Sequence, residues 1–308
     1  MSAADPRREW DERAGVRTCP RRRLGDELDA GQLFFPPALV PYGDHPRVRA
    51  LPAPHRRALF ARHLYHYLDF TTQFETRVVN RVTERIAGGR SGLDVRTATR
   101  LDAYRIYVDE GYHSLCSLDV IDQLSRASGI APAPYDFAPF LARLDAVGEG
   151  ALPDAGRLAQ LLQVVVFETL ITAILNDVPK DPRVLTLVRD TVRDHARDEG
   201  RHHVFFAGLF REVWGQQPAA LRGRIARCLP GLIRSSLLPD LRPVRASLAA
   251  AGLGPADVAA VVADSYPADR VDQGIRTASR HAVRLFEETG VLDVPGGREA
   301  FSTAELLR

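Results

Sequence analysis

The sequence predicts an all-α protein whose centre is a bundle of four helices. Three observations support this fold class. Apolar residues recur at helical spacing through most of residues 55–215, and no strand-like alternation of apolar and polar residues stands out. In addition, the motif Glu-x-x-His occurs twice, each time after a separate Glu within an apolar stretch. Because Glu and His three positions apart share one face of a helix, the repeats indicate helices that present polar groups together.

The chain begins with a segment that differs from the rest. Residues 1–30 are charged and poor in aliphatic side chains, so we expect a mobile N-terminal arm, with a solvated tail favoured over a binding segment. Residues 34–54 contain six prolines and predict an extended wrap, because proline interrupts helices. We expect residues 31–308 to form one domain, with the bundle core at about residues 55–215.

The four bundle helices are expected at residues 55–86, 94–128, 156–177 and 181–214. Glycines end the first two helices, Asp94 is expected to cap the second, and Asp181-Pro182 resembles a cap followed by proline in the first helical turn.

Two regions lie outside these four helices. Residues 129–154, with four prolines, form a long connection between the second and third helices. Such a crossover is found in ferritin-like bundles. After residue 219, helical stretches predict a C-terminal layer that ends in an amphipathic segment near residues 269–288. The full prediction is therefore a ferritin-like four-helix bundle with an N-terminal wrap and additional C-terminal helices.

The two repeats define a candidate metal centre. Glu75 precedes Asp109-Glu110-Gly111-Tyr112-His113, and Glu168 precedes Asp198-Glu199-Gly200-Arg201-His202. A lone Glu followed by Glu-x-x-His, used twice, is the ligand set of a ferritin-like di-iron site. Glu168 lies in an apolar run, where an ionised carboxylate needs a metal or an ion-pair partner; buried ion pairs are the alternative interpretation. Carboxylate and imidazole ligands suit iron(II) or manganese(II).

Three further residues adjoin this set. Asp109 and Asp198 each precede a motif Glu by one residue, which turns them about 100° around the helix. We expect each to accept the free N–H of a metal-binding His, and surface ion pairs are the alternative. His195 lies four residues before Glu199 on the same helix face, where the first repeat has Ile106. We favour an additional metal ligand over a core histidine.

Composition argues against several other classes of protein. The chain has 308 residues, 45% hydrophobic and 26% charged, as in a globular enzyme, and its net charge of +2 does not predict binding to nucleic acid or an anionic membrane. Three cysteines are too few for a disulfide framework. We find no signal peptide and no membrane-spanning stretch, so a cytoplasmic location is expected. Without a dinucleotide fingerprint or a cysteine cluster, the electrons for oxygen chemistry must come from a separate donor or reductase.

On these residues the chain resembles the di-iron N-oxygenase family typified by p-aminobenzoate N-oxygenase and the arylamine oxygenase of the chloramphenicol pathway. The resemblance covers the four-helix core and includes both repeats and His195. It implies two iron ions, O2 as co-substrate, and seven ligands: Glu75, Glu110, His113, Glu168, His195, Glu199 and His202.

The resemblance also implies an activity. Such homodimeric enzymes of bacterial natural-product biosynthesis oxidise a primary amine, an arylamine or an amino-acid-like amine, through hydroxylamine and nitroso compounds to a nitro product. Two alternatives remain open. One is a di-iron C-hydroxylase, desaturase or radical-generating subunit, and the other is a non-catalytic iron-storage relative of ferritin.

A few residues are candidates for the substrate pocket. Tyr67 resembles a pocket position of the family, and Phe74 and Ile174 are candidates for the same cavity. Arg276 or Arg280, on the C-terminal amphipathic segment, is the candidate for holding an aryl carboxylate. Ordinary packing is the competing interpretation for each of these residues.

Overall fold

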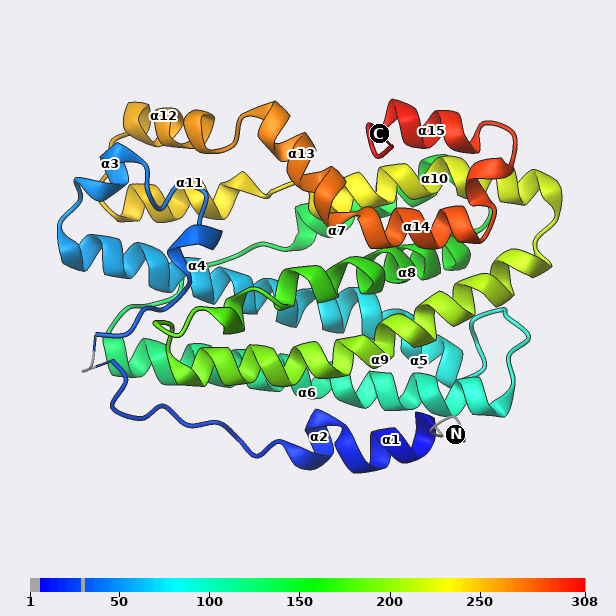
Figure 1. Cartoon of the computed structure of the whole chain (residues 1–308), viewed down its shortest axis with the longest axis horizontal. Helices are drawn as coiled ribbons and strands as arrows, with labels where there is room; N and C mark the ends of the chain where they lie inside the picture. Colours follow the sequence, from blue (N-terminus) through cyan, green and yellow to red (C-terminus); the bar gives the residue numbers. More distant parts are fainter. Residues whose placement is uncertain (1–5, 29–30, 308) are drawn as a thin grey trace.

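The computed structural model describes residues 6–28 and 31–307, and within them it confirms the all-α fold class. The one β-type contact in these ranges is an isolated parallel bridge between Leu33 and Val184. Figure 1 shows the bundle helices in the middle, the C-terminal helices along one side and the first two N-terminal helices, α1 (Pro6–Arg13) and α2 (Gly15–Thr18), along the other. No helix in the described part of the chain combines the length and apolar composition that a bilayer span requires.

Four long helical segments make the bundle. They are α4 (Ala53–Phe74) with its continuation α5 (Asn80–Ala87), α6 (Thr97–Ser128), α8 (Gly156–Leu175) and α9 (Thr186–Gln216). α4 and α5 pack on α6, α8 packs on α9, and α6 and α9 contact each other. Fully buried side chains such as Leu64, Val165 and Phe210 fill the interior. Each such side chain contributes roughly 1.5–3 kcal/mol of transfer free energy, so the apolar spacing that predicted the helices also explains why they associate.

A π-helical turn of five residues, Glu75–Val79, separates α4 from α5. The sequence predicted one unbroken helix across residues 55–86, and this turn is where the structure differs. π-turns of this kind interrupt α-helices and occur frequently at functional sites. Glu75 is the first residue of the turn and is buried.

Two predicted helix starts are wrong by a few residues. Asp94 does not cap α6, which begins at Thr97. α9 begins at Thr186 and not at Asp181, whose carboxylate accepts the backbone N–H and the side chain of Arg183 in a local turn. Asp satisfies backbone donors in turns as well as at helix ends, so the same residue type predicts both.

The connection between α6 and α8 contains a helix that the sequence did not predict. α7 (Ala138–Ala151) carries Pro139 in its first turn, where a missing N–H is tolerated. It packs against α8 and α10 (Ala219–Leu237). The proline content that predicted a loop therefore marks the start of a helix and the extended chain before it.

The C-terminal layer consists of α10 and five shorter helices: α11 (Leu241–Ala250), α12 (Pro255–Ser265), α13 (Ala268–Ala278), α14 (Arg280–Glu288) and α15 (Gly297–Thr303). α10, α13 and α14 contact α8 and so cover one side of the bundle. The amphipathic segment predicted near residues 269–288 is two helices that meet at Ser279, not one.

α1 and α2 lie on the opposite side of the bundle, whereas the later α3 (Pro46–Arg49) packs on α12 of the C-terminal layer (Figure 1). The segment expected to be a mobile arm contains α1 (Pro6–Arg13) and α2 (Gly15–Thr18), and α2 contacts both α6 and α9. We call residues 10–22 the N-terminal strap. Residues 34–54 are not the extended wrap that the prolines predicted, because they consist mainly of a 3-10 turn at Pro37–Leu39, a turn at residues 41–44, the short α3 and the start of α4.

Candidate metal centre

Two overlapping groups of buried acidic and imidazole side chains lie inside the bundle. The first is Glu75, Glu110, His113, His195 and Glu199, and the second is Glu110, Glu168, Glu199 and His202. Within each group, one potential ligand atom per residue lies within 4.8 Å of all the others. The structure therefore brings together all seven residues singled out from the sequence. The two shared residues, Glu110 and Glu199, come from the two helices that carry the Glu-x-x-His motifs.

Glu199 lies at the centre of the cluster. Its Oε1 is 2.9 Å from His195 Nε2, 3.5 Å from His202 Nδ1 and 3.6 Å from His113 Nδ1. Glu110 has a similar position, because its Oε2 is 3.2 Å from His113 Nδ1 and its Oε1 is 2.9 Å from His202 Nδ1. The two motif carboxylates thus each face an imidazole of both repeats.

The two lone glutamates occupy the outer ends of the cluster. Glu75 Oε1 is 3.0 Å from His195 Nε2, and Glu75 Oε2 accepts a hydrogen bond from the Ser114 hydroxyl at 3.3 Å. Glu168, on α8, is almost completely buried among apolar neighbours. His203 of α9 approaches only its backbone carbonyl. Nothing in the sequence pointed to Ser114, because a serine within a helix is common.

Two carboxylate oxygens of the cluster, Glu168 Oε2 and Glu199 Oε2, are buried without a hydrogen-bond partner. Buried polar groups are nearly always paired, since an unpaired one costs free energy. Both atoms are carboxylate oxygens, which are ligands that iron(II) accepts. Four glutamate carboxylates also balance the charge of two divalent cations. The residues present therefore fit a pair of metal ions.

Each histidine of a Glu-x-x-His motif contacts an aspartate, here called its backing aspartate, through Nε2, the ring nitrogen that faces away from the cluster. Asp198 Oδ2 lies 3.0 Å from His113 Nε2, and Asp109 Oδ2 lies 3.2 Å from His202 Nε2. With Nε2 facing a carboxylate, the proton of the neutral ring belongs on Nε2, and the Nδ1 lone pair faces the cluster. The aspartate of each repeat therefore contacts the histidine of the other.

The pKa values of the glutamates diverge in the metal-free cluster. Burial raises the pKa of Glu168 well above its usual value, and the negative charges of Glu199 and Glu110 add to this. Burial acts in the same direction on Glu199, but the charge of His202 and hydrogen bonds from His195 and His202 outweigh it, so the Glu199 pKa is well below the usual value. Without a metal, the cluster thus stabilises the ionised form of Glu199 and the protonated form of Glu168.

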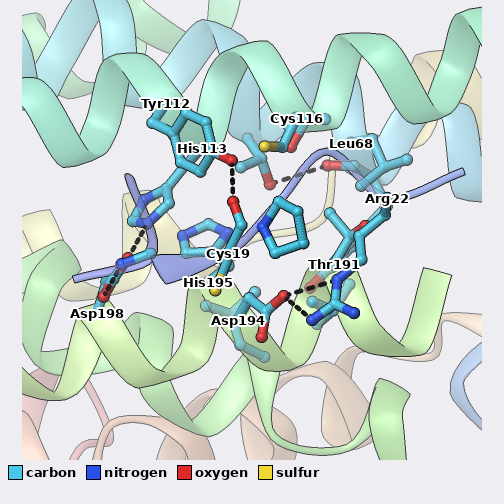
Figure 2. A pocket seen from close by; sticks show the side chains of 17 residues that line it. Cys19, Arg22, Leu68, Tyr112, His113, Cys116, Thr191, Asp194, His195 and Asp198 are labelled. Atoms are coloured by element: carbon cyan, nitrogen blue, oxygen red, sulfur yellow. Dashed lines mark hydrogen bonds and ion pairs between the residues drawn. The ribbon is translucent and has the colours of Figure 1, made fainter. Parts of the chain in front are cut away.

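A small cavity adjoins the cluster (Figure 2). His113 and His195 line it together with Tyr67 of α4, Cys116 of α6 and Gly15 of the N-terminal strap. Its volume of about 30 Å³ accommodates a molecule of the size of water or O2. The Tyr67 hydroxyl is buried without a hydrogen-bond partner, and burial raises the pKa of this phenol.

Phe74, Arg276 and Arg280, which were also predicted to line the pocket, lie elsewhere. Phe74 stacks on Phe167 with ring centroids 3.5 Å apart and does not line this cavity. Arg276 faces Glu305 at 3.5 Å, and Arg280 is exposed, so neither contributes to it. The side chain of Ile174 lies outside those that the structure describes.

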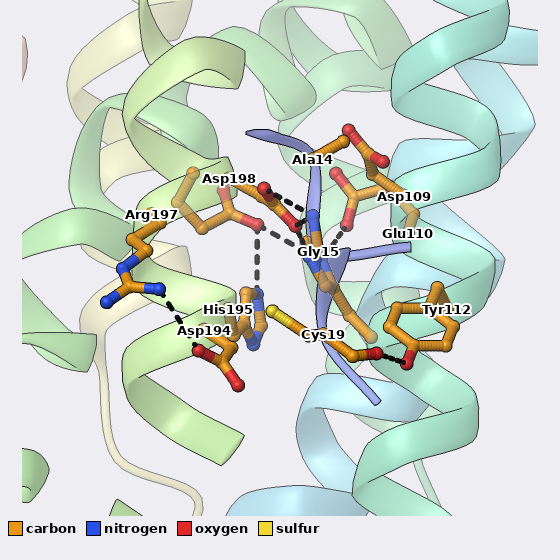
Figure 3. Close-up of polar contacts among 12 residues, drawn as sticks. Ala14, Gly15, Cys19, Asp109, Glu110, Tyr112, Asp194, His195, Arg197 and Asp198 are labelled. Carbon is orange, nitrogen blue, oxygen red and sulfur yellow. Dashed lines mark hydrogen bonds and ion pairs between the residues drawn. The ribbon is translucent and has the colours of Figure 1, made fainter. Parts of the chain in front are cut away.

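The N-terminal strap contributes contacts that sequence reasoning missed. The Trp10 Nε1–H donates to Asp109 Oδ2 at 2.9 Å. The backbone N–H of Gly15 donates to Asp198 at 3.1 Å (Figure 3). The Tyr112 hydroxyl donates to the carbonyl of Cys19 at 2.7 Å. A tryptophan within a charged segment was the only available signal, and it does not reveal which residue its indole contacts.

Comparison with known proteins gives one family. The family model described as P-aminobenzoate N-oxygenase AurF matches residues 23–290, which is most of the chain. The matched region contains all seven cluster residues and both backing aspartates, and it begins just after the N-terminal strap. No curated protein matches the chain.

Proposed function

The chain belongs to the p-aminobenzoate N-oxygenase family, and we propose that it oxidises an arylamine or an amino-acid-like primary amine, through hydroxylamine and nitroso compounds, to a nitro product. Members of this family are di-iron N-oxygenases, so the protein is an oxidoreductase. The observation that carries the proposal is the pair of buried groups that share Glu110 and Glu199. Natural-product biosynthesis is the proposed setting.

The seven cluster residues are the proposed ligands of two iron ions. Glu75, His113 and His195 belong to one group, Glu168 and His202 belong to the other, and Glu110 and Glu199 belong to both. This division supports a site in which the shared carboxylates serve two ions at once. When bound, the iron pair supplies the redox chemistry that activates O2.

The chain's own residues prepare this chemistry. Asp109 and Asp198 fix the rings of His202 and His113 and keep their Nδ1 atoms directed at the cluster. His195 adds a third imidazole nitrogen, between Glu75 and Glu199, which Ile106 does not offer on the first repeat. The N-oxygenase assignment, in preference to a C-hydroxylase or a desaturase, rests on this residue and on the family.

The cavity beside the cluster supports a role for Tyr67. Leu68, Leu175 and Val192 give the cavity apolar walls that limit access of water, while the Tyr67 hydroxyl has no protein partner. We propose that this hydroxyl hydrogen-bonds to the substrate.

A homodimer and an external electron donor complete the proposal. One face of α6 exposes Leu101, Tyr104, Val108, Leu115 and Leu118, each between 43% and 61% accessible. A row of apolar side chains at helical spacing is typical of an interaction surface. We propose that a second copy of the chain covers this α6 face. For the chain itself, the continuous core from Phe34 to Leu306 supports one domain over residues 31–308.

The activity can be tested directly. The protein is loaded anaerobically with ferrous iron, then given O2, a chemical reductant and a panel of arylamines and amino acids, and products are identified by mass spectrometry. We expect nitroso or nitro products from at least one amine and none from a Glu168→Ala, Glu199→Ala double variant. Exclusively carbon-hydroxylated products would favour a C-hydroxylase. Iron accumulating well beyond two per chain, without oxidation of any amine, would favour an iron-storage protein.

A further inference from the structure

We infer that the N-terminal strap, residues 10–22, is part of the metal centre, with Trp10 and Gly15 as positioning residues for the two backing aspartates. This inference rests on the proposed iron ligands but concerns residues that lie before the region matched by the family model. The strap donates hydrogen bonds, from Trp10 and Gly15, to the backing aspartates. It acts one step further out, on the carboxylates that orient two of the histidines.

Trp10 holds Asp109. The indole N–H donates to Asp109 Oδ2 at 2.9 Å, and the same oxygen is 3.2 Å from His202 Nε2. The other oxygen, Oδ1, has no hydrogen-bond partner, so Oδ2 is the atom that fixes the carboxylate. The guanidinium groups of Arg17 and Arg105 each lie 5.8 Å from the Trp10 ring, in cation–π geometry that keeps the indole in place.

Gly15 holds Asp198. Its backbone N–H is 3.1 Å from Oδ2 and 3.2 Å from Oδ1 of Asp198, and Oδ2 is 3.0 Å from His113 Nε2. A Cβ at position 15 would lie only 2.6 Å from Asp198 Oδ2. The backbone can therefore approach the carboxylate this closely only if residue 15 has no side chain.

The strap is fixed to both helices that carry the motifs. Arg21 pairs with Asp119 of α6 at 2.6 Å, and Arg22 pairs with Asp194 of α9 at 2.7 Å. The carbonyl of Cys19 accepts the hydroxyl of Tyr112 on α6. The Arg22–Asp194 pair and the Tyr112 contact place Trp10 and Gly15 against α6 and α9 at the level of the two aspartates, whereas the Arg21–Asp119 pair is more exposed.

A change in the strap should therefore alter metal binding without altering any ligand. Partners of a metal-binding histidine typically change metal affinity by about 10–100-fold when they are removed. Trp10 and Gly15 act through such partners, so we expect smaller effects: roughly threefold for Trp10→Phe, and roughly tenfold for Gly15→Ala, which displaces the carboxylate itself.

The test measures iron, not turnover. The full-length protein and its Trp10→Phe and Gly15→Ala variants are loaded with ferrous iron, and the rate of iron release to a chelator is followed. Both variants should still bind two irons per chain and release them faster. Arg21→Ala is the matched control, because it removes an exposed contact of the same strap and contacts neither backing aspartate. Its release rate should equal that of the wild type.

A double-variant cycle separates positioning from general loosening. If Trp10 acts through Asp109, Trp10→Phe should have no further effect on iron release in an Asp109→Asn background. Additive effects, release rates equal to wild type in both strap variants, or an equal acceleration in Arg21→Ala would each overturn the inference while leaving the metal centre intact. A wild-type protein that binds no iron would overturn the proposed function as well.

Discussion

His113 and Asp198 lie 3.0 Å apart, although 85 residues separate them in the chain. The same relationship links His202 to Asp109 over 93 residues, at 3.2 Å. Each repeat thus provides the carboxylate that orients the imidazole of the other. Neither Glu-x-x-His motif is complete within its own half of the bundle, and the two halves depend on each other for ligand geometry.

Removing one of these carboxylates should weaken iron binding. In Asp198→Asn, the amide keeps the shape of the side chain but loses the charge that favours an N–H on His113 Nε2. We expect iron affinity to fall by about 10–100-fold. Titration with ferrous iron under anaerobic conditions measures this, with Asp177→Asn, an exposed partner of Lys180, as the control. Equal affinities for the two variants would contradict the role given to Asp198.

Glu168→Gln should have two opposite effects. Burial and the charge of Glu199 raise the pKa of Glu168, so the ionised side chain destabilises the metal-free fold at neutral pH, and a neutral amide relieves this. We expect a higher melting temperature for the metal-free variant, and an iron content near one per chain where the wild type binds two. Calorimetry and elemental analysis test both effects. Glu149→Gln, at an exposed carboxylate, should change neither quantity.

Acid should destabilise the protein through His63. Burial lowers the pKa of His63 to about 3, and the neighbouring His66 adds to this, whereas an unfolded histidine has a pKa of about 6.5. The unfolded chain therefore binds a proton that the folded chain excludes. Above pH 6.5, protonation of His63 does not reduce the free energy of unfolding. As the pH falls from 6.5 towards 3, the free energy of unfolding decreases by at most about 1.4 kcal/mol per pH unit.

Urea unfolding at pH 7 and pH 5 measures this loss. The neutral His63 ring forms a hydrogen bond with the Tyr42 hydroxyl at 2.9 Å. A Gln side chain at position 63 can form the same hydrogen bond but does not titrate. His63→Gln should therefore unfold with a weaker pH dependence than the wild type. An unchanged pH dependence would assign the acid sensitivity to other groups.

The proposed dimer surface can be tested with charge. Leu115 and Leu118 are 61% and 55% accessible on the α6 face, so replacing both with Glu should not disturb the core. We expect the double variant to elute as a monomer in chromatography with light scattering, with its iron content unchanged. Arg245→Glu, at an exposed position of α11, is the control for added negative charge. A double variant with the mass of the wild type would exclude this face as the contact.

The sequence predicted the bundle and the cluster because both leave periodic signals. Apolar spacing identifies helices, and the repeated Glu-x-x-His motif places ligands on their faces, so the order of residues alone was enough to locate Glu110, His113, Glu199 and His202. His195 was found by its distance along the helix from Glu199. These inferences depend only on local geometry, which the chain determines residue by residue.

The features that the sequence did not predict arise from tertiary contacts. Trp10 and Gly15 lie in a segment whose charge is typical of a solvated tail, yet they are held by aspartates roughly 100 and 180 residues away. The prolines near α7 predicted a loop where the structure has a helix. The π-turn at Glu75–Val79 has no characteristic residue composition by which it could be predicted. Local propensity does not encode such contacts, since they form only when the helices are assembled.

The π-turn that begins at Glu75 also limits how this helix can be changed. One residue corresponds to about 100° of rotation in an α-helix. Converting the π-turn into regular α-helix without deleting a residue would turn α4 relative to α5 by about that angle, because the π-turn holds one residue more than an α-helical turn. Tyr67 and Glu75 would then leave the interior if Val82 and Ile86 stayed in it. An engineer who made the helix more regular would gain backbone order and lose a carboxylate from the cluster.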